Sequence, residues 1–227
     1  MYSEKHWRLS PKIDNESKWK MEPPLNKIVI ASNNAGKLAE ISRLLAPLGI
    51  EVVTQSSLGV TEADEPHMTF VENALAKARH ASLATGLPAL ADDSGICVSA
   101  LRGDPGVFSA RYAGEPRSDE RNNRKLVEAL HGQSDRRAYY YCVIVLLRHG
   151  QDPQPVIIED TWRGEIIAEP IGQGGFGYDP HFFLPELGKT AAELSIEEKN
   201  RISHRGKALA RLVQMLSENE TVPVVPV

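Results

Sequence analysis

Residues 27–37 read KIVIASNNAGK, and this stretch decides the fold class because it joins an apolar run directly to a polar turn. The run at 28–31 has the length and composition of a buried strand. After the turn, apolar side chains recur on one helical face, at Leu38, Ile41, Leu44, Leu45 and Leu48. Gly49 then ends the helix. A strand that leads through a short turn into a helix predicts an α/β protein.

The remaining pattern continues to mix strands and helices. Strands are expected at 51–54, 87–91, 96–101, 139–147 and 181–184, and helices at 70–85, 118–130 and from Ser195 to about Leu216. Asp92-Asp93-Ser94-Gly95 favours a turn, and Arg163-Gly164 favours the turn of a hairpin between 155–162 and 165–168. That hairpin predicts a mixed sheet. We expect one domain over 25–218, with a flexible extension at 1–24 and a frayed tail at 219–227.

The composition excludes several classes of protein. The chain has 227 residues, and its net charge of −4, from 26 Lys and Arg against 30 Asp and Glu, argues against a nucleic-acid polymer as partner. A local basic pocket for a small anion remains compatible with that charge. No apolar run is long enough to cross a bilayer, and the polar N-terminus is not typical of a secretory signal. Two widely separated cysteines, Cys97 and Cys142, fit a reducing, cytoplasmic location.

The turn after the first strand is a candidate phosphate site. Free backbone N–H groups at a helix start attract phosphate, and Lys37 adds a positive charge. The turn is not a Walker loop, because the expected glycine five residues before Gly36 is absent and Leu38 replaces the hydroxyl residue. On this turn alone, an ordinary helix cap with an exposed lysine remains the alternative. The candidate residues are Ser32, Asn33, Asn34, Ala35, Gly36 and Lys37.

Two acidic pairs are candidate metal ligands. Asp92 and Asp93 follow an apolar run, and crowded carboxylates become favourable beside a divalent cation. Asp64 and Glu65 form a second pair, so together these residues supply oxygen ligands suited to Mg²⁺. A solvated turn is an equally good interpretation of the stretch from Asp92 to Gly95.

Two further stretches are candidates for nucleotide binding. Phe176 of 176–180 has a ring that could stack on a base, although core packing of at least one ring there is the alternative. Lys199, His204 and Arg205 supply cations near the last helix, where a break between residues 200 and 203 would bring them together. A solvated basic turn is the usual meaning of such a cluster. The polar side of the helix 70–85, with Asn73, Lys77 and His80, is most simply its solvent face. A pocket-facing role for Lys77 is the alternative, which spacing does not decide.

Six motifs in one order resemble the inosine triphosphate pyrophosphatase family, also called the dITP/XTP pyrophosphatases. The resemblance runs from about Lys27 to about Leu216. The first three are SNNAGK at 32–37, TFVENA at 69–74 and ADDSG at 91–95, and the last three are PGVFSARY at 105–112, GGFGYDP at 174–180 and SHRG at 203–206.

The resemblance implies an elongated, two-lobed α/β fold around a long mixed β-sheet, with a central cleft, in a homodimer. It implies Mg²⁺-dependent hydrolysis of ITP, dITP and XTP to the monophosphate and pyrophosphate, which cleanses the nucleotide pool. Alternatives are a different base preference and a regulatory nucleotide-binding module without turnover. The first loop reads Ser-Asn where many members have Thr-Gly, and the loop at 64–67 lacks the usual glycine.

By the same likeness each candidate residue takes a role. Asp93 matches the family's proton acceptor and metal ligand, and Asp64 with Glu65 matches its acidic metal-binding loop. The substrate-binding positions match Ser32, Asn33, Asn34, Ala35, Gly36, Lys37, Ser94, Phe176, Gly177, Tyr178, Asp179, Lys199, His204 and Arg205.

Overall fold

A computed structural model describes residues 25–220. Its centre is one seven-stranded sheet in the order β2-β1-β3-β4-β5-β6-β7. The strands are β1 (Lys27–Ile30), β2 (Glu51–Thr54), β3 (Ala89–Val98), β4 (Arg137–Leu147), β5 (Val156–Ile166), β6 (Phe182–Leu184) and β7 (Lys189–Thr190). β2, β1 and β3 run parallel, and the pairs from β3 to β7 run antiparallel. The mixed sheet expected from the sequence is therefore confirmed.

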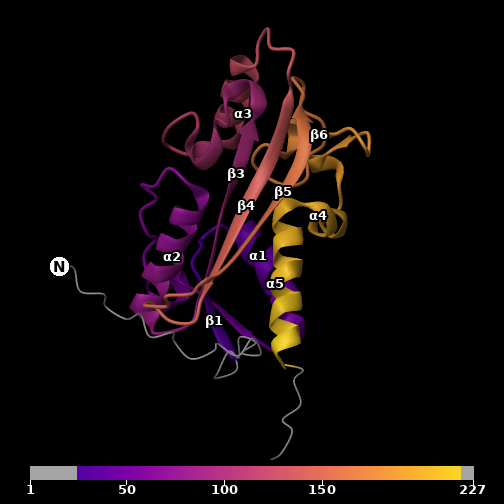
Figure 1. The fold of residues 1–227 in the computed structure, drawn as a ribbon. Coiled ribbons are helices and arrows are strands. Elements are labelled where there is room, and N and C mark those ends of the chain that lie inside the picture. Colours follow the sequence, from indigo (N-terminus) through magenta and orange to yellow (C-terminus); the bar gives the residue numbers. More distant parts are fainter. Residues whose placement is uncertain (1–24, 221–227) are drawn as a thin grey trace, which may run out of the picture.

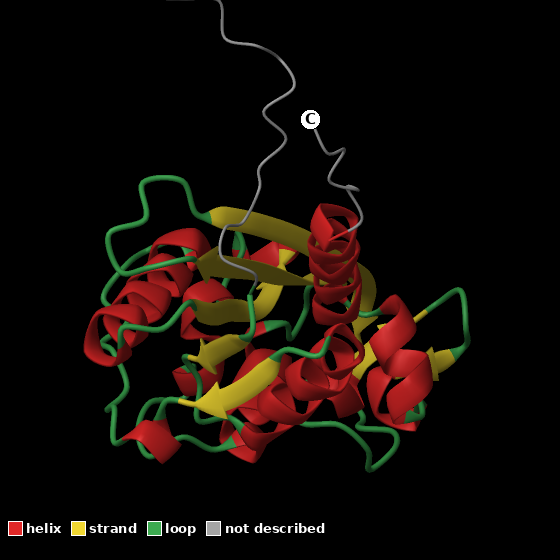
Figure 2. Ribbon diagram, turned by 90° about the horizontal axis from the view of Figure 1, so that it is seen from below, coloured by secondary structure: helices red, strands yellow, loops and turns green. Residues whose placement is uncertain are grey.

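Helices cover both faces of this sheet, as Figure 2 shows from below. They are α1 (Ala35–Leu45), α2 (Phe70–Thr85), α3 (Asp119–Ala129), α4 (Ile196–Ile202) and α5 (His204–Glu220). α2 and α5 lie on opposite sides of the long strands β4 and β5, and α3 lies toward the other end (Figure 1). Helix α5 ends at Glu220, past the end near Leu216 that the sequence predicted. The predictions for residues 1–24 and 221–227 lie outside the described residues, and the two-lobed description stays a prediction.

Alternation along β1 explains how the two helical layers are held. Ile28 and Ile30 pack with α1 and α5, whereas Val29 and Ala31 pack with α2 on the opposite face. Successive side chains of a strand point to opposite faces, so a strand buried on both sides is apolar throughout. A third cluster, which contains Leu126 of α3, fills the other end of the sheet.

Two expected turns are instead parts of continuous strands. Asp92 to Gly95 lies inside β3, where these residues pair with Cys142 to Ile144 and Tyr141 of β4. Arg163-Gly164 lies inside β5, and a Cβ atom on Gly164 would stand 2.5 Å from the Phe183 carbonyl oxygen. The glycine is needed for close approach of β6, not for a turn. Local turn preference was overridden by antiparallel pairing with distant strands.

Candidate functional site

One cavity of about 630 Å³ collects most of the candidate residues. Its walls come from the β1–α1 turn, the loop at 62–65, helix α2, strand β3, the short helix Gly106–Arg111, the loop at 176–179, and the α4–α5 junction. The predicted site residues that line it are Ser32, Asn33, Asn34, Lys37, Asp64, Glu65, Asp93, Ser94, Phe176, Gly177, Tyr178, Asp179, Lys199, His204 and Arg205. Segments far apart in the sequence therefore meet at one place.

The turn after β1 forms an open helix start. The Asn34 side chain caps α1 by accepting the Lys37 N–H at 3.1 Å, and the Asn34 N–H donates to Ser32 Oγ at 3.2 Å. Ala35 begins the helix, and a Cβ atom on Gly36 would lie 3.2 Å from the Phe176 ring. The helix start and the aromatic ring are therefore neighbours, and a phosphate held by the first would lie near the second.

The adjacent acids Asp92 and Asp93 face opposite sides of β3 and have different partners. Asp92, which is 1% exposed, pairs with Lys37 at 2.9 Å and with Arg205 at 3.2 Å. Burial would raise the pKa of Asp92, but Lys37 and Arg205 together hold it far below its ordinary value. Burial does raise the pKa of Asp93, although Lys77 opposes that rise. Asp92 is therefore a charged partner for Lys37 and Arg205, whereas Asp93 is the more basic of the two carboxylates.

Asp93 shares Lys77 with the acidic loop. Lys77 Nζ lies 2.9 Å from Asp93 Oδ1 and 2.9 Å from Glu65 Oε1, and its side chain is 12% exposed. Burial lowers the pKa of Lys77, but Asp93, Asp92 and Glu65 raise it above its ordinary value. The expectation that this side of the helix faces solvent is therefore wrong for Lys77. It is also wrong for Asn73, which is 1% exposed.

Within the cavity, Asp64, Glu65 and Asp93 are the candidate metal ligands predicted from the sequence. Within residues 25–220, no group of three or more His, Cys, Asp or Glu side chains is placed to hold a metal ion. Glu65 and Asp93 converge on one position, and Asp64 lines the same cavity with an exposed side chain. Mg²⁺ usually takes one or two carboxylates and completes its shell with water and substrate phosphate. A two-carboxylate site therefore suffices for that ion.

The loop before β6 is fixed by the buried carboxylate of Asp179. It accepts the Phe176 N–H at 2.9 Å and the Tyr140 hydroxyl at 3.2 Å, and it forms a buried ion pair with Lys199. Lys199 Nζ also lies 4.7 Å from the centre of the Phe176 ring. Tyr178 is buried, whereas Phe176 is 37% exposed toward the cavity. Of the two rings, Phe176 is the one available to a base.

The break between α4 and α5 falls at Ser203, within the expected interval, and it brings His204 and Arg205 into the cavity wall. The His204 ring stacks on Tyr140 with centroids 4.8 Å apart. Burial lowers the pKa of His204 well below its ordinary value. The His204 imidazole is therefore neutral near pH 7 and serves as a flat, uncharged surface.

Arg205 is held on three sides by the protein. It donates to Asp92 at 3.2 Å, to Glu40 at 2.6 Å and to Ser94 at 3.0 Å. A guanidinium carries five N–H donors, so these bonds leave part of its donor set for a ligand. Residues 203–206 meet α4 closely, since a Cβ atom on Gly206 would lie 1.8 Å from the Asn200 carbonyl oxygen.

Two side chains of α3 hold Gly177, and sequence reasoning missed both. Asp119 accepts the Gly177 N–H at 2.7 Å, and Asn123 donates to the Gly177 carbonyl at 2.8 Å. Gly177 has a φ of +64°, which explains why a glycine stands there. The capping sequence predicted the helix, but nothing in it indicated a contact 58 residues away.

Arg111 was missed as well, although it lies in one of the quoted motifs. It donates to Glu65 Oε2 at 3.2 Å and to the Glu65 carbonyl at 3.3 Å. Arg111 therefore fixes both the backbone and the side chain of the acidic loop. The available signal was that Arg111 belongs to the motif at 105–112, from which no site residue was chosen.

Comparison with known proteins decides the family. A family model described as the Ham1 family matches residues 28–215. The chain belongs to the Ham1 family. It is 65% identical over 195 residues to the dITP/XTP pyrophosphatase of Ralstonia nicotianae, covering 85% of this chain and 97% of that protein. It is 62% identical over 191 residues to the dITP/XTP pyrophosphatase of Chromobacterium violaceum, covering 84% and 97%.

Solved Ham1 structures have the same fold. The HAM1 protein of Coxiella burnetii superposes with a TM-score of 0.81 at 51% identity, covering 85% of this chain and 98% of that one. The Ham1 protein of Staphylococcus aureus gives a TM-score of 0.77 at 42% identity, covering 85% and 98%. The family and the α/β class expected from the six motifs are both confirmed.

Proposed function

We propose that this Ham1-family chain hydrolyses non-canonical purine nucleoside triphosphates, namely ITP, dITP and XTP, to the monophosphate and pyrophosphate. The observation that carries the proposal is that one cavity contains all three kinds of group. Asp93 lies in the same cavity as the open helix start with Lys37 and the ring of Phe176. A triphosphate held at the helix start presents its α-phosphorus to the carboxylate, while its base reaches the aromatic ring.

Mg²⁺ is the proposed cofactor, and the residues present fit it. Glu65 and Asp93 would hold the ion, because both carboxylates already converge on a single cation at 2.9 Å. Asp64, which lines the same cavity, remains a predicted further ligand. When bound, the ion offsets the negative charge that develops on the leaving pyrophosphate.

Asp93 is the proposed general base. It removes a proton from water as the water oxygen bonds to the α-phosphorus and the bond to the pyrophosphate oxygen breaks. Burial raises the pKa of Asp93, so its carboxylate is a stronger base than an ordinary aspartate. Lys37 and the N–H groups at the start of α1 keep the triphosphate in line for that attack.

Base selection is assigned to Arg205 and Phe176. A 6-oxo purine presents a hydrogen-bond acceptor where adenine presents a donor. The N–H groups of Phe176 and Gly177 are already donated to Asp179 and Asp119, which favours Arg205 as the donor to the base. A buried donor left unpaired by adenine discriminates by roughly 10⁴.

A nucleotide panel tests the proposal. Pyrophosphate release with Mg²⁺ is measured for ITP, dITP, XTP, GTP and ATP, with wild type, Asp93→Asn and the exposed control Asp104→Asn. We expect fast release from the three non-canonical nucleotides, near-complete loss in Asp93→Asn, and wild-type rates in the control. Equal rates on ATP and ITP would refute purine selectivity, and no release from any triphosphate would favour a regulatory binding module. Near-normal rates in Asp93→Asn would remove Asp93 from the mechanism.

A homodimer and a cytoplasmic location belong to the same proposal. No helix among residues 25–220 has the length and apolar character needed to cross a membrane.

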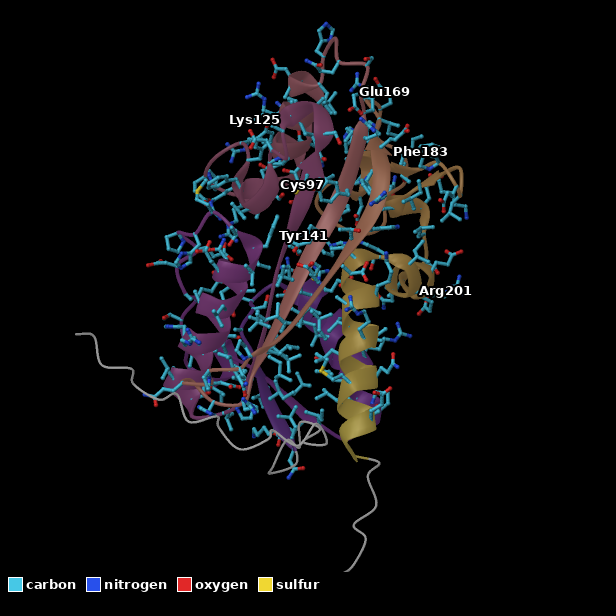
Figure 3. The ribbon with its side chains drawn as sticks, viewed as in Figure 1. Cys97, Lys125, Tyr141, Glu169, Phe183 and Arg201 are labelled. Atoms are coloured by element: carbon cyan, nitrogen blue, oxygen red, sulfur yellow. The ribbon has the colours of Figure 1, made fainter. Side chains whose placement is uncertain are left out.

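A second hollow on the sheet is lined by aromatic and basic side chains, among them Tyr139, Tyr141 and Arg163. Tyr141 and Cys97, which also lines it, are labelled in Figure 3. A dimeric mass in solution supports the expected state, and a monomeric mass overturns it.

A further inference from the structure

Lys77 occupies an unusual place in the cavity. Its ammonium lies between the two carboxylates assigned to the metal, 2.9 Å from Glu65 Oε1 and 2.9 Å from Asp93 Oδ1. The side chain reaches there from α2 and is only 12% exposed. A cation already sits where two carboxylates converge, and it belongs to the protein itself.

The other oxygens of these carboxylates are also engaged. Arg111 donates to Glu65 Oε2 at 3.2 Å, and Asn73 donates to Asp93 Oδ2 at 3.5 Å. The remaining oxygens, Glu65 Oε1 and Asp93 Oδ1, are the two bonded to Lys77. A divalent ion held by Glu65 and Asp93 would therefore compete with the ammonium for these oxygens.

We propose that Lys77 is a place-holder for the metal ion: its ammonium joins Glu65 to Asp93 in the metal-free protein, and a divalent cation displaces it on binding. The inference rests on the metal assignment made for the proposed function. Without a cation, two neighbouring carboxylates repel each other and drift apart. With Lys77 between them they stay close, and the displaced ammonium remains in a cavity built for an anion.

The exchange has a cost that can be measured. Each metal ion must break the hydrogen bonds of a buried ammonium to two charged acceptors before it binds. Hydrogen bonds to charged groups correspond to about a 10- to 100-fold change in an equilibrium constant. Removing the ammonium without changing the carboxylates should tighten metal binding by about that factor.

The experiment is Mn²⁺ binding to the nucleotide-free protein, measured by electron paramagnetic resonance and calorimetry on wild type and Lys77→Met. We expect the Mn²⁺ Kd of Lys77→Met to fall about 10- to 100-fold. Lys37→Met is the matched control, because it removes one positive charge from the same cavity but from a lysine paired with Asp92. It reports the through-space effect of charge, which we expect to be several-fold smaller.

The melting temperature gives an independent test, because Lys77→Met should bind metal more tightly but be less stable without it. Metal-free Lys77→Met should melt at a lower temperature than wild type, because Glu65 and Asp93 lose their shared partner. Saturating Mg²⁺ should raise the melting temperature of Lys77→Met more than that of wild type. If Lys77→Met does not fold, ¹⁵N spectroscopy of the lysine ammonium groups in wild type decides the matter. The Lys77 signal, assigned by its loss in Lys77→Arg, should shift on adding Mg²⁺.

The outcomes separate this inference from the assignment on which it rests. The place-holder role is overturned if Lys77→Met binds Mn²⁺ no more tightly than wild type, or no more tightly than Lys37→Met. The assignment of the metal site is unaffected by that result. An unshifted Lys77 signal in Mg²⁺-loaded wild type also overturns that role and leaves the metal assignment unaffected. If wild type binds no Mn²⁺ at millimolar concentration, the metal assignment itself fails and the inference falls with it.

Discussion

Replacing Arg205 by methionine should cost far more stability than the loss of an ordinary ion pair. Its side chain is 4% exposed and contacts Asp92, which is 1% exposed, and Glu40, which is 14% exposed. Methionine fills similar space but removes the cation paired with Glu40 and one of the two cations paired with Asp92, which keeps Lys37. Removing one partner of a buried pair costs about 3–5 kcal/mol. For a protein of this size that corresponds to a fall of roughly 6–20 °C in melting temperature.

A double-variant cycle shows whether the uncompensated charge is the cause. Adding Glu40→Gln to Arg205→Met removes the carboxylate that lost its cation, so the double variant should regain about 1–3 kcal/mol relative to Arg205→Met. The assay is urea unfolding followed by circular dichroism at pH 7.

The control is Arg43→Met. Arg43 pairs with Glu197 at 3.0 Å, but the two side chains are 58% and 67% exposed, so water screens the pair. Such pairs contribute about 0–1 kcal/mol. A loss in Arg205→Met no larger than that in Arg43→Met would refute the reasoning. So would a double variant that is less stable than Arg205→Met.

Three further predictions follow from single contacts. Burial lowers the pKa of His204 in the folded protein, so the contribution of this residue to stability is complete above about pH 6.5. Below that pH the unfolded chain binds a proton that the folded protein does not, and the free energy of unfolding should fall by about 1.4 kcal/mol per pH unit. His204→Gln should flatten that slope in urea titrations, and exposed His131→Gln should not. Asp119→Ala should raise the KM for ITP roughly tenfold with kcat nearly unchanged, since Gly177 loses a charged acceptor; an unchanged KM would exclude that positioning role. Gly95→Ala should lower stability by about 1–3 kcal/mol in thermal melts, because its Cβ would lie 2.3 Å from the Gly106 carbonyl oxygen; a wild-type melting curve would contradict this.

Several helix starts were predictable because their causes are local. The Thr69 side chain accepts the Glu72 N–H at the start of α2, and Ser195 with Glu198 forms a capping box at the start of α4. Gly86 ends α2 in the left-handed conformation. Each feature depends on atoms within a few residues, so a short window of sequence contains everything needed.

The acidic stretch in β3 was mispredicted for the opposite reason. Asp, Ser and Gly favour turns when isolated, but here Asp92 is stabilised by Lys37 and Arg205, which lie 55 and 113 residues away in the chain. The motif order placed these residues in one site. It did not indicate which cation faces which carboxylate, because that pairing depends on how the strands and helices pack. The spacing on the helix 70–85 did not decide between solvent and pocket for Lys77 for the same reason.

Those pairings give a physical reason for the divalent cation in the proposed function. Five cations of the site region are each bound to a carboxylate of the protein. The cations are Lys37, Lys77, Arg111, Lys199 and Arg205, and the carboxylates are Glu40, Glu65, Asp92, Asp93 and Asp179. Five positive and five negative charges leave this set neutral, so it attracts a triphosphate weakly by charge alone. A divalent ion bound at Glu65 and Asp93 makes the set positive, so metal and triphosphate should bind cooperatively.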